Sequence, residues 1–326
     1  PARALALRGY SAAVRAEVGE PRAEVTLIGP GGENLVKYAC VMNGLKDAAG
    51  RTGMGAVMGS KRLKAVAAWG SESLEAADEE TIRQTARRAA QEVRDGTRAK
   101  WVSKAGTGGQ ELEDGILQGN MPIRNFRDGE FPEIGNLEFI MDKIGVRMEG
   151  CYACAVRCKK VVKAEREAYS VDPAYGGPEY ESIGSLGTTC GVSDIVAMSQ
   201  ATALCNAYSL DTIGAGVTIA FAMECFEQGL FTLKDTGGID LRFGNGDAVI
   251  AMVDKIAHRE GLGDLLAEDL ETIAKRVGHG AEMFAVHVKG QAYPMHEPRY
   301  KRGMALGYAV SPTGADHCHS LHDSGL

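Results

Sequence analysis

The pattern of apolar and polar positions predicts two strands and a long helix in the first third of the chain. Residues 22–30 and 62–70 form short apolar runs, each closed by Gly or Pro, which is typical of β-strands. Over residues 75–102, apolar positions recur with a 3.6-residue period among many charges. This pattern predicts an amphipathic helix with an exposed charged face.

Further along, the pattern predicts an irregular connection followed by helices. Residues 103–148 are rich in Gly, Asn and Pro, so we expect a long loop and a domain boundary there. Ser193 is the expected N-cap of the first helix after this connection, and Gly229 is the expected end of the second. The predicted helices span residues 193–210, 211–230, 246–261 and 263–278.

Composition and charge describe an ordinary globular protein. The 326 residues suffice for about two domains, and the net charge of −7 argues against a nucleic-acid-binding surface. No apolar run approaches the roughly 20 residues that span a bilayer. We therefore expect a cytoplasmic protein without a membrane span. The chain starts without Met and stops without a closing element, so we also expect it to be incomplete at both ends.

Three cysteines stand close together in the stretch CYACAVRC. Cys151, Cys154 and Cys158 have C-x2-C-x3-C spacing, and thiolates at such spacing suit an iron–sulfur cluster or zinc. A zinc site would favour a second motif with two closely spaced ligands. Four further cysteines are isolated in the sequence: Cys190, Cys205, Cys225 and Cys318. A [4Fe-4S] cluster is therefore the leading interpretation, with free, partly buried thiols as the alternative.

A [4Fe-4S] cluster at this triplet would need a fourth ligand. By position within the chain, Cys318 is the best internal candidate, because Cys205 and Cys225 lie in apolar helical patterns that indicate core packing. Basic residues at 157, 159 and 160 flank the triplet and would stabilise the extra negative charge of a reduced cluster.

The glycine-rich stretch GRTGMGAVMGSK, residues 50–61, is a candidate anion-binding loop. Its glycine spacing does not match the G-x-G-x-x-G pattern of dinucleotide sites, and a strand is expected to follow it, so we reject a nicotinamide site. Closely spaced glycines flanked by Arg51 and Lys61 suit a phosphate-bearing ligand. A purely structural turn is the equal alternative.

Two further stretches carry acid–base residues. GGPEYES places Glu179 and Glu181 two residues apart, on the same side if the segment is extended and splayed if it is helical. GADHCHS places Asp316, His317, Cys318 and His319 after a glycine turn. Metal binding, proton transfer and a polar loop all remain open for this second stretch.

Taken in order, five motifs make the chain resemble the aldehyde:ferredoxin oxidoreductase family of tungsten bis-pterin enzymes. The motifs are AAGRTGMGAVMGSKRLKAV, CYACAVRC, GGPEYES, LCNAYSLDTIGAG and GMALGYAVSPTGADH, and they span nearly the whole chain. The resemblance implies an α+β fold. Residues 1–72 would be the C-terminal part of a β-rich domain that cradles the cofactor, and residues 73–326 a mainly helical region that binds cluster and pterin.

The resemblance also implies cofactors and the residues that hold them. These cofactors are a tungsten bis-pterin, with molybdenum as a possible replacement, an Mg²⁺ ion that bridges the pterin phosphates, and a [4Fe-4S] cluster on Cys151, Cys154 and Cys158. The fourth cluster ligand would lie beyond Leu326, which makes Cys318 a loop residue. The implied pterin-binding residues are Ala49, Gly50, Arg51, Gly53, Gly55, Asn206, Leu210 and Asp211.

The motif around Asp211 departs from the family pattern D-x-x-G-L-D. Asn206 replaces the first Asp and Ser209 replaces Gly, so contact by Asp211 is favoured over contact by Asn206. Glu179 and His317 match positions near the metal, where they would act as base and acid or orient the carbonyl.

The function implied is oxidation of aldehydes to carboxylic acids. Electrons would pass through the cluster to ferredoxin or a ferredoxin-like subunit, and an oligomer is expected. Two alternatives remain. One is the catalytic subunit of a tungsten benzoyl-coenzyme A reductase, and the other is an electron-transfer module without pterin.

Overall fold

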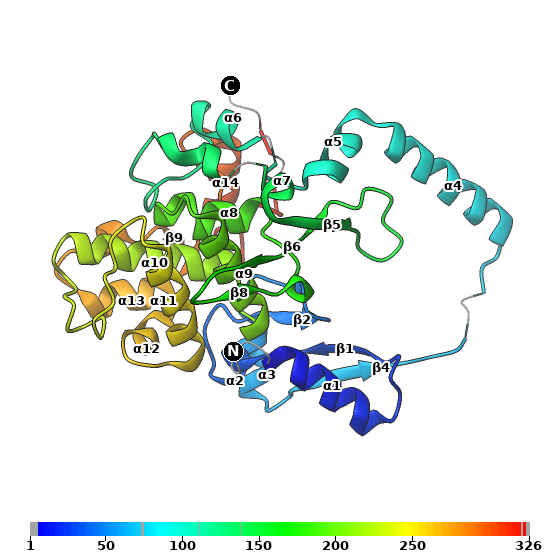
Figure 1. Cartoon of the computed structure of the whole chain (residues 1–326), viewed down its shortest axis with the longest axis horizontal. Coiled ribbons are helices and arrows are strands. Elements are labelled where there is room, and N and C mark those ends of the chain that lie inside the picture. The colour runs from blue at the N-terminus through cyan, green and yellow to red at the C-terminus, as the bar shows by residue number, and fades with distance from the viewer. Residues whose placement is uncertain (1–5, 73–74, 110, 138, 321, 324–326) are drawn as a thin grey trace.

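The fold was analysed in a computed structural model, which describes residues 6–72, 75–109, 111–137, 139–320 and 322–323. A small antiparallel sheet and short helices form its N-terminal part, and helices form most of the rest (Figure 1). This arrangement confirms the predicted α+β class. No helix among the described residues is long and apolar enough to cross a membrane.

The N-terminal part is built on a four-stranded antiparallel sheet with the order β3-β2-β1-β4. The two predicted strands are adjacent in this sheet, where Val25 pairs with Ala67 and Thr26 with Val66. The elements of this part are α1 (Ala6–Val18), β1 (Glu24–Leu27), α2 (Pro30–Glu33), β2 (Val41–Asn43), β3 (Asp47–Ala49), α3 (Met54–Ser60) and β4 (Ala65–Ala68).

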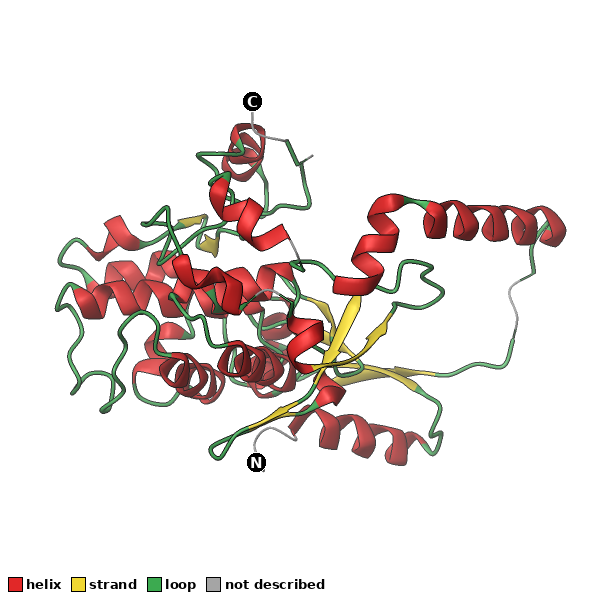
Figure 2. Cartoon of the chain, turned by 45° about the horizontal axis from the view of Figure 1, so that its top comes forward, coloured by secondary structure: helices red, strands yellow, loops and turns green. Residues whose placement is uncertain are grey.

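The long predicted helix is broken in two and projects from the body. Helix α4 (Glu79–Asp95) ends at Gly96, and α5 (Thr97–Ala105) starts there with a change of direction. Gly96 has an extended conformation, which interrupts the helical hydrogen bonding. Asp78 caps α4 by accepting a hydrogen bond from the Thr81 amide at 2.9 Å. No described residue of α4 is buried, and the helix extends away from the other elements (Figure 2).

The expected irregular connection contains more regular structure than predicted. It holds α6 (Glu111–Leu117), the 3-10 helix η2 (Pro132–Asn136), α7 (Ile140–Ile144) and β5 (Gly145–Glu149). Strand β5 pairs with β6 (Lys159–Val162), so the segment 150–158 that carries the three cysteines is the loop between two paired strands. Strands β7 (Ala164–Glu165) and β8 (Ser170–Val171) and η3 (Pro173–Tyr175) lead from there to α8 (Tyr180–Leu186) and η4 (Thr188–Cys190).

Two buried helices form the centre of the molecule. Helices α9 (Ile195–Tyr208) and α10 (Thr212–Glu227) are apolar on nearly all sides, as expected for helices surrounded by protein. Asp194 caps α9 through the amides of Val196 and Ala197, so the predicted cap at Ser193 is wrong by one residue. The aspartate carboxylate reaches the free amides of the first turn from this position.

The remaining helices and two short strands pack around this centre. The predicted helix over 263–278 is two helices, because Asp269 caps a new start by accepting from the Thr272 amide at 2.9 Å. The elements are α11 (Gly246–His258), α12 (Leu262–Leu266), α13 (Leu270–Val277), η5 (Ala281–Phe284), β9 (His287–Val288), β10 (Gln291–Ala292) and α14 (Arg302–Val310). One continuous apolar core runs from Leu7 to Met295 and joins the two predicted regions, 1–72 and 73–326.

Candidate functional site

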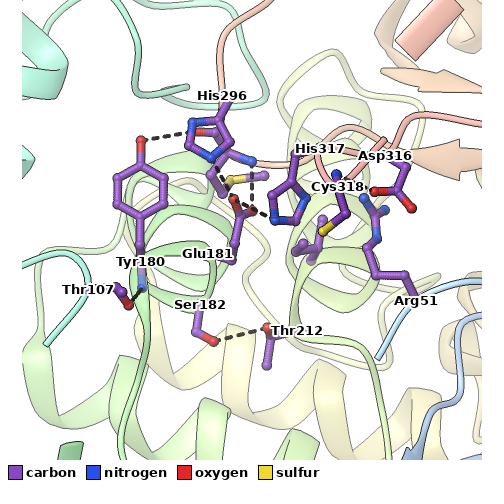
Figure 3. A network of polar contacts seen from close by, with 12 residues as sticks. Arg51, Thr107, Tyr180, Glu181, Ser182, Thr212, His296, Asp316, His317 and Cys318 are labelled. Atoms are coloured by element: carbon purple, nitrogen blue, oxygen red, sulfur yellow. Dashed lines mark hydrogen bonds and ion pairs between the residues drawn. The ribbon is translucent and has the colours of Figure 1, made fainter. Parts of the chain in front are cut away.

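A buried carboxylate between two histidines is the centre of the candidate site (Figure 3). Helix α8 starts at Tyr180, so Glu179 is its N-cap and Glu181 lies inside its first turn. The Glu181 Oε1 atom lies 3.1 Å from Nε2 of His296 and 3.8 Å from Nε2 of His317. Its Oε2 atom accepts a hydrogen bond of 2.8 Å from the Met295 amide. Three distant segments of the chain therefore meet at this carboxylate.

The histidines keep Glu181 ionised although it is buried. Burial alone would raise the pKa of the carboxyl, but the imidazoles of His296 and His317 and the Met295 amide outweigh this effect and lower the pKa. Because a carboxylate accepts hydrogen bonds, the Nε2–H tautomer is the one that suits both imidazoles. The Nδ1 atoms of both rings are buried and have no hydrogen-bond partner among the described residues.

Aromatic rings hold His296 in place. Its ring stacks on Tyr180 with centroids 5.1 Å apart and an interplanar angle of 15°. The Tyr180 hydroxyl donates to the carbonyl of Met295 at 3.0 Å, and the Asn120 amide donates to the hydroxyl at 3.2 Å. His322 packs edge-on against His296, and burial together with His296 lowers the pKa of His322 to about 4. His322 is therefore neutral at neutral pH.

This cluster opens onto a cavity of about 790 Å³, which we call the histidine cavity. Glu179 also lines it, but its carboxylate accepts a short hydrogen bond from the Thr107 hydroxyl and lies 3.8 Å from Nζ of Lys160. The two glutamates are thus splayed, as the helical alternative predicts, and the one that contacts His317 is Glu181. The lining residues are Arg98, Thr107, Asp114, Gly115, Gln118, Asn120, Glu179, Tyr180, Glu181, His296, Lys301, His317 and His322.

A second cavity, of about 320 Å³, lies beside the glycine-rich loop and is called the loop cavity below. Arg51, Gly53 and Asp211 line it, together with Lys37 and Lys289. Of the other residues implied as pterin-binding, Ala49, Gly50, Gly55, Asn206 and Leu210 do not line this cavity. The Asn206 amide donates to the Tyr175 carbonyl at 2.9 Å, and Leu210 is buried in the core.

Arg51 ties together three segments at the loop cavity. Its guanidinium donates to Asp211 Oδ2 at 3.3 Å, to the Ala292 carbonyl at 2.6 Å and to the Ala315 carbonyl at 2.9 Å. Asp211 is also the N-cap of α10 through the Ile213 amide. Burial raises the pKa of Asp211, and the nearby Arg51 only partly offsets this. A cationic, glycine-bordered wall of this kind fits a phosphate-bearing cofactor.

The glycines of the loop are explained mainly by packing. Gly53 has φ of +71°, and a Cβ there would lie 2.2 Å from the Lys37 carbonyl oxygen. A Cβ at Gly55 would lie 2.4 Å from the Cys40 carbonyl oxygen. Helix α3 directly follows Gly53. The strand expected after the glycines, β4, therefore starts only after this helix. The structural role thus accounts for both glycines, while Gly53 also borders the cavity.

The segment after Gly314 connects the two cavities. Ala315 accepts from Arg51 at the loop cavity, and His317, two residues on, faces Glu181 at the histidine cavity. The ligand atoms of Asp316, His317 and Cys318 lie within 4.8 Å of one another. Burial and Asp316 raise the pKa of the Cys318 thiol. Glu181 also raises this pKa, whereas Arg51 lowers it. Cys318 therefore lies between the cavities, as a loop residue.

Cys151, Cys154 and Cys158 lie on one surface loop. Cys151 and Cys154 border a surface depression of about 410 Å³ together with Arg157. Backbone amides of Arg157 and Val156 lower the pKa of Cys154, which favours the thiolate that a metal needs. Burial raises the pKa of Cys158, and Glu179, Cys151 and Cys154 raise it further. The three thiols are thus close enough to interact, and the donor set fits an iron–sulfur cluster.

Sequence analysis missed the pairing of Glu181 with His296. The Gly-Gly-Pro-Glu run before an apolar segment is a helix-start pattern, which would have placed Glu181 inside a helix. His296 carries no comparable signal, because only the fold brings residues 181 and 296 together.

Two family models together match most of the chain. The family model "Aldehyde ferredoxin oxidoreductase, domains 2 & 3" matches residues 84–323, and "Aldehyde ferredoxin oxidoreductase, N-terminal domain" matches residues 5–70. The tungsten-containing aldehyde ferredoxin oxidoreductase of Thermococcus kodakarensis is 38% identical over 94% of this chain and half of the relative. That of Pyrococcus furiosus is 37% identical with the same coverage.

Two less similar proteins have names other than aldehyde ferredoxin oxidoreductase. The WOR-like subunit of an aliphatic sulfonate oxidoreductase from Pyrococcus furiosus is 33% identical over 89% of this chain and 47% of its own length. A solved structure of the active-site complex BamBC of benzoyl coenzyme A reductase matches with a TM-score of 0.75 and 26% identity. The match covers 94% of this chain and 48% of the chain in the reductase structure. The chain spans about half the length of the relatives that it matches.

Proposed function

Because this chain belongs to the aldehyde ferredoxin oxidoreductase family, we propose that it oxidises aldehydes to carboxylic acids with a tungsten bis-pterin cofactor. In this reaction an aldehyde and water give a carboxylate, two electrons and three protons. The observation that carries the proposal is the buried Glu181 carboxylate between His296 and His317, one short segment away from the cationic loop cavity.

The residues present fit the cofactors of such an enzyme. Arg51 and Asp211 would hold the pterin, with Mg²⁺ at its phosphates, and Cys151, Cys154 and Cys158 would hold a [4Fe-4S] cluster. When bound, these groups supply the two-electron oxidation of the carbonyl carbon and the one-electron steps to an acceptor. A fourth cluster ligand from outside residues 151–158 remains part of the proposal.

The role of the chain's own residues is to move protons and to orient the carbonyl. With Nε2–H directed at Glu181, each imidazole has a free Nδ1 lone pair that takes up a proton. The carboxylate 3.1 Å from His296 stabilises the resulting imidazolium. In this scheme His317 keeps the acid–base role inferred from its motif, and Glu181 replaces Glu179 as its partner. Tyr180 positions His296 by stacking.

The electron acceptor and the assembly are part of the same proposal. Electrons would leave through the loop 150–158, which carries the three cysteines, to ferredoxin or a ferredoxin-like subunit. Tyr152 in this loop is fully exposed between two of the cysteines. We further propose an oligomeric, cytoplasmic enzyme. A catalytic subunit of a benzoyl-coenzyme A reductase is the second candidate, because a solved complex of that kind shares the fold over 94% of this chain.

Metal analysis combined with an activity assay tests the proposal. Anaerobically purified holoenzyme should contain tungsten or molybdenum, at least four irons per chain as one [4Fe-4S] cluster requires, and reduce a viologen dye with simple aldehydes. Reduction of benzoyl-coenzyme A without aldehyde oxidation would favour the second candidate. Iron without tungsten or molybdenum would leave an electron-transfer module, and zinc alone would contradict the cluster as well.

A further inference from the structure

The histidine cavity is lined almost entirely by polar side chains. Of the 13 lining residues, Gly115 alone lacks a side chain that can make a hydrogen bond, and no aliphatic side chain is among them. A cavity that selected simple aliphatic aldehydes would present aliphatic side chains instead. The lining therefore indicates a substrate that is polar away from its carbonyl group.

The charged residues of the lining divide into paired and unpaired groups. The Glu181 carboxylate is held by two histidines, and Glu179 by the Thr107 hydroxyl and Lys160. Both carboxylates therefore already have polar partners.

The cations Lys301 and Arg98 have no such partners. No hydrogen bond or ion pair joins either side chain to another described residue.

Lys301 is a half-buried ammonium on the cavity wall. Burial lowers its pKa, and the acid that acts on it, Asp323, accepts hydrogen bonds from the amides of Gly303 and Met304 through its two carboxylate oxygens. A partly desolvated lysine without a carboxylate in contact is a favourable place for a ligand oxyanion, because binding restores the interaction lost on burial.

The position of Lys301 relative to the acid–base cluster fixes the orientation of a ligand. His322 packs on His296 with ring centroids 4.4 Å apart, and Lys301 is close enough to His322 to affect its charge. Lys301, His322 and Glu181 thus line one cavity. A ligand with an oxyanion at Lys301 would extend past the neutral His322 and place its other end at His296 and His317.

We propose that the substrate is an aldehyde that carries an anionic oxygen group, a carboxylate or a phosphate, which Lys301 binds while Arg98 lies at the cavity rim. This inference rests on the proposed aldehyde oxidation and adds the substrate class to it. The carbonyl end lies at His296 and His317, and the anionic end stays away from the ionised Glu181. Lys301 acts as a specificity-determining residue.

The test compares two aldehydes of equal chain length, butanal and 4-oxobutanoate, in the wild-type holoenzyme and in Lys301→Met. In the wild type, kcat/KM should be about 10–100-fold higher for 4-oxobutanoate, which is the effect of one or two charge-assisted contacts. Lys301→Met should remove most of this preference through KM and leave butanal within about twofold. Glyceraldehyde 3-phosphate in place of 4-oxobutanoate tells whether phosphate or carboxylate is preferred.

Arg302→Met is the matched control. Arg302 is exposed, adjacent in the chain and outside the cavity lining, so it changes the net charge equally and should leave the preference intact. If both variants lose the preference for 4-oxobutanoate, the preference is a long-range charge effect and the assignment to Lys301 is wrong. If both keep it, the assignment is also wrong.

Calorimetric titration with the products separates this inference from the proposed function. Succinate should bind more tightly than butanoate to the wild type, and Lys301→Met should abolish the difference. Equal turnover of butanal and 4-oxobutanoate, with equal binding of their products, would overturn the substrate class while leaving aldehyde oxidation standing. Absence of any aldehyde turnover, with selective succinate binding retained, would instead overturn the reaction and keep an anion site at Lys301.

Discussion

At the residue scale, the choice of the glutamate that contacts His317 depends on where one helix begins. Glu179 and Glu181 stand two residues apart in the sequence, and either could face His317. Because α8 starts at Tyr180, the backbone turns between them and sends the two carboxylates to different partners. Glu181 meets the histidines, whereas Glu179 meets Thr107 and Lys160.

This geometry predicts unequal effects of two conservative substitutions. Glu181→Gln removes the charge that stabilises an imidazolium at His296 or His317, so kcat should fall about 10²–10⁴-fold, the usual range for acid–base groups. Glu179→Gln keeps an acceptor for the Thr107 hydroxyl and should lower kcat by about tenfold or less. The measurement is viologen-linked aldehyde oxidation by enzyme with unchanged tungsten content. A larger loss of kcat in Glu179→Gln would assign the acid–base role to Glu179 instead.

At the element scale, close packing of α8 against α10 shapes the floor of the site. A Cβ at Gly216 of α10 would lie 2.5 Å from the carbonyl group of Ser185 in α8. Ser182, one turn earlier on α8, donates to the Thr212 hydroxyl at 3.0 Å (Figure 3). The helix that carries Glu181 is therefore held by backbone-to-backbone approach at one turn and by a hydrogen bond at the other.

The close approach predicts a stability effect. Gly216→Ala should lower the free energy of unfolding by about 1–3 kcal/mol, because the helices must move apart. The matched control is Gly115→Ala in α6, where the nearest atom to the new Cβ is 4.0 Å away. That substitution should be neutral or stabilise by up to about 1 kcal/mol through helix propensity. Urea denaturation of both variants measures the difference, and equal midpoints would contradict the packing argument.

At the scale of the whole molecule, the site is assembled from segments far apart in the sequence around two buried helices. Arg51 from the N-terminal part contacts Asp211 at the start of a central helix and Ala292 and Ala315 near the C-terminus. Helices α9 and α10 lie between these parts and are buried nearly throughout. Helix α4, by contrast, contributes nothing to this assembly and stands away from it (Figures 1 and 2).

This contrast predicts the pattern of amide hydrogen exchange. Amides of α4 should exchange orders of magnitude faster than those of α10, because opening α4 exposes no buried side chain. Exchange followed by mass spectrometry at neutral pH resolves the two peptides. Slow exchange in α4 would show that another surface covers the apolar positions Ile82 and Val93, which are 57% and 37% exposed.

The sequence by itself predicted several of the elements and the family. Short-range patterns predicted β1, β4, α9, α10 and α11, because burial periodicity and end signals are local properties. The five motifs identified the family, which the matching family models confirm. The assignments of individual site residues made from those motifs stay predictions.

The tertiary structure alone decided which residues meet. The contact of Glu181 with His296 joins residues 115 positions apart in the chain, and no local pattern encodes it. Proton-transfer chemistry requires contacts of a few ångströms, and these arise only when distant segments fold against one another.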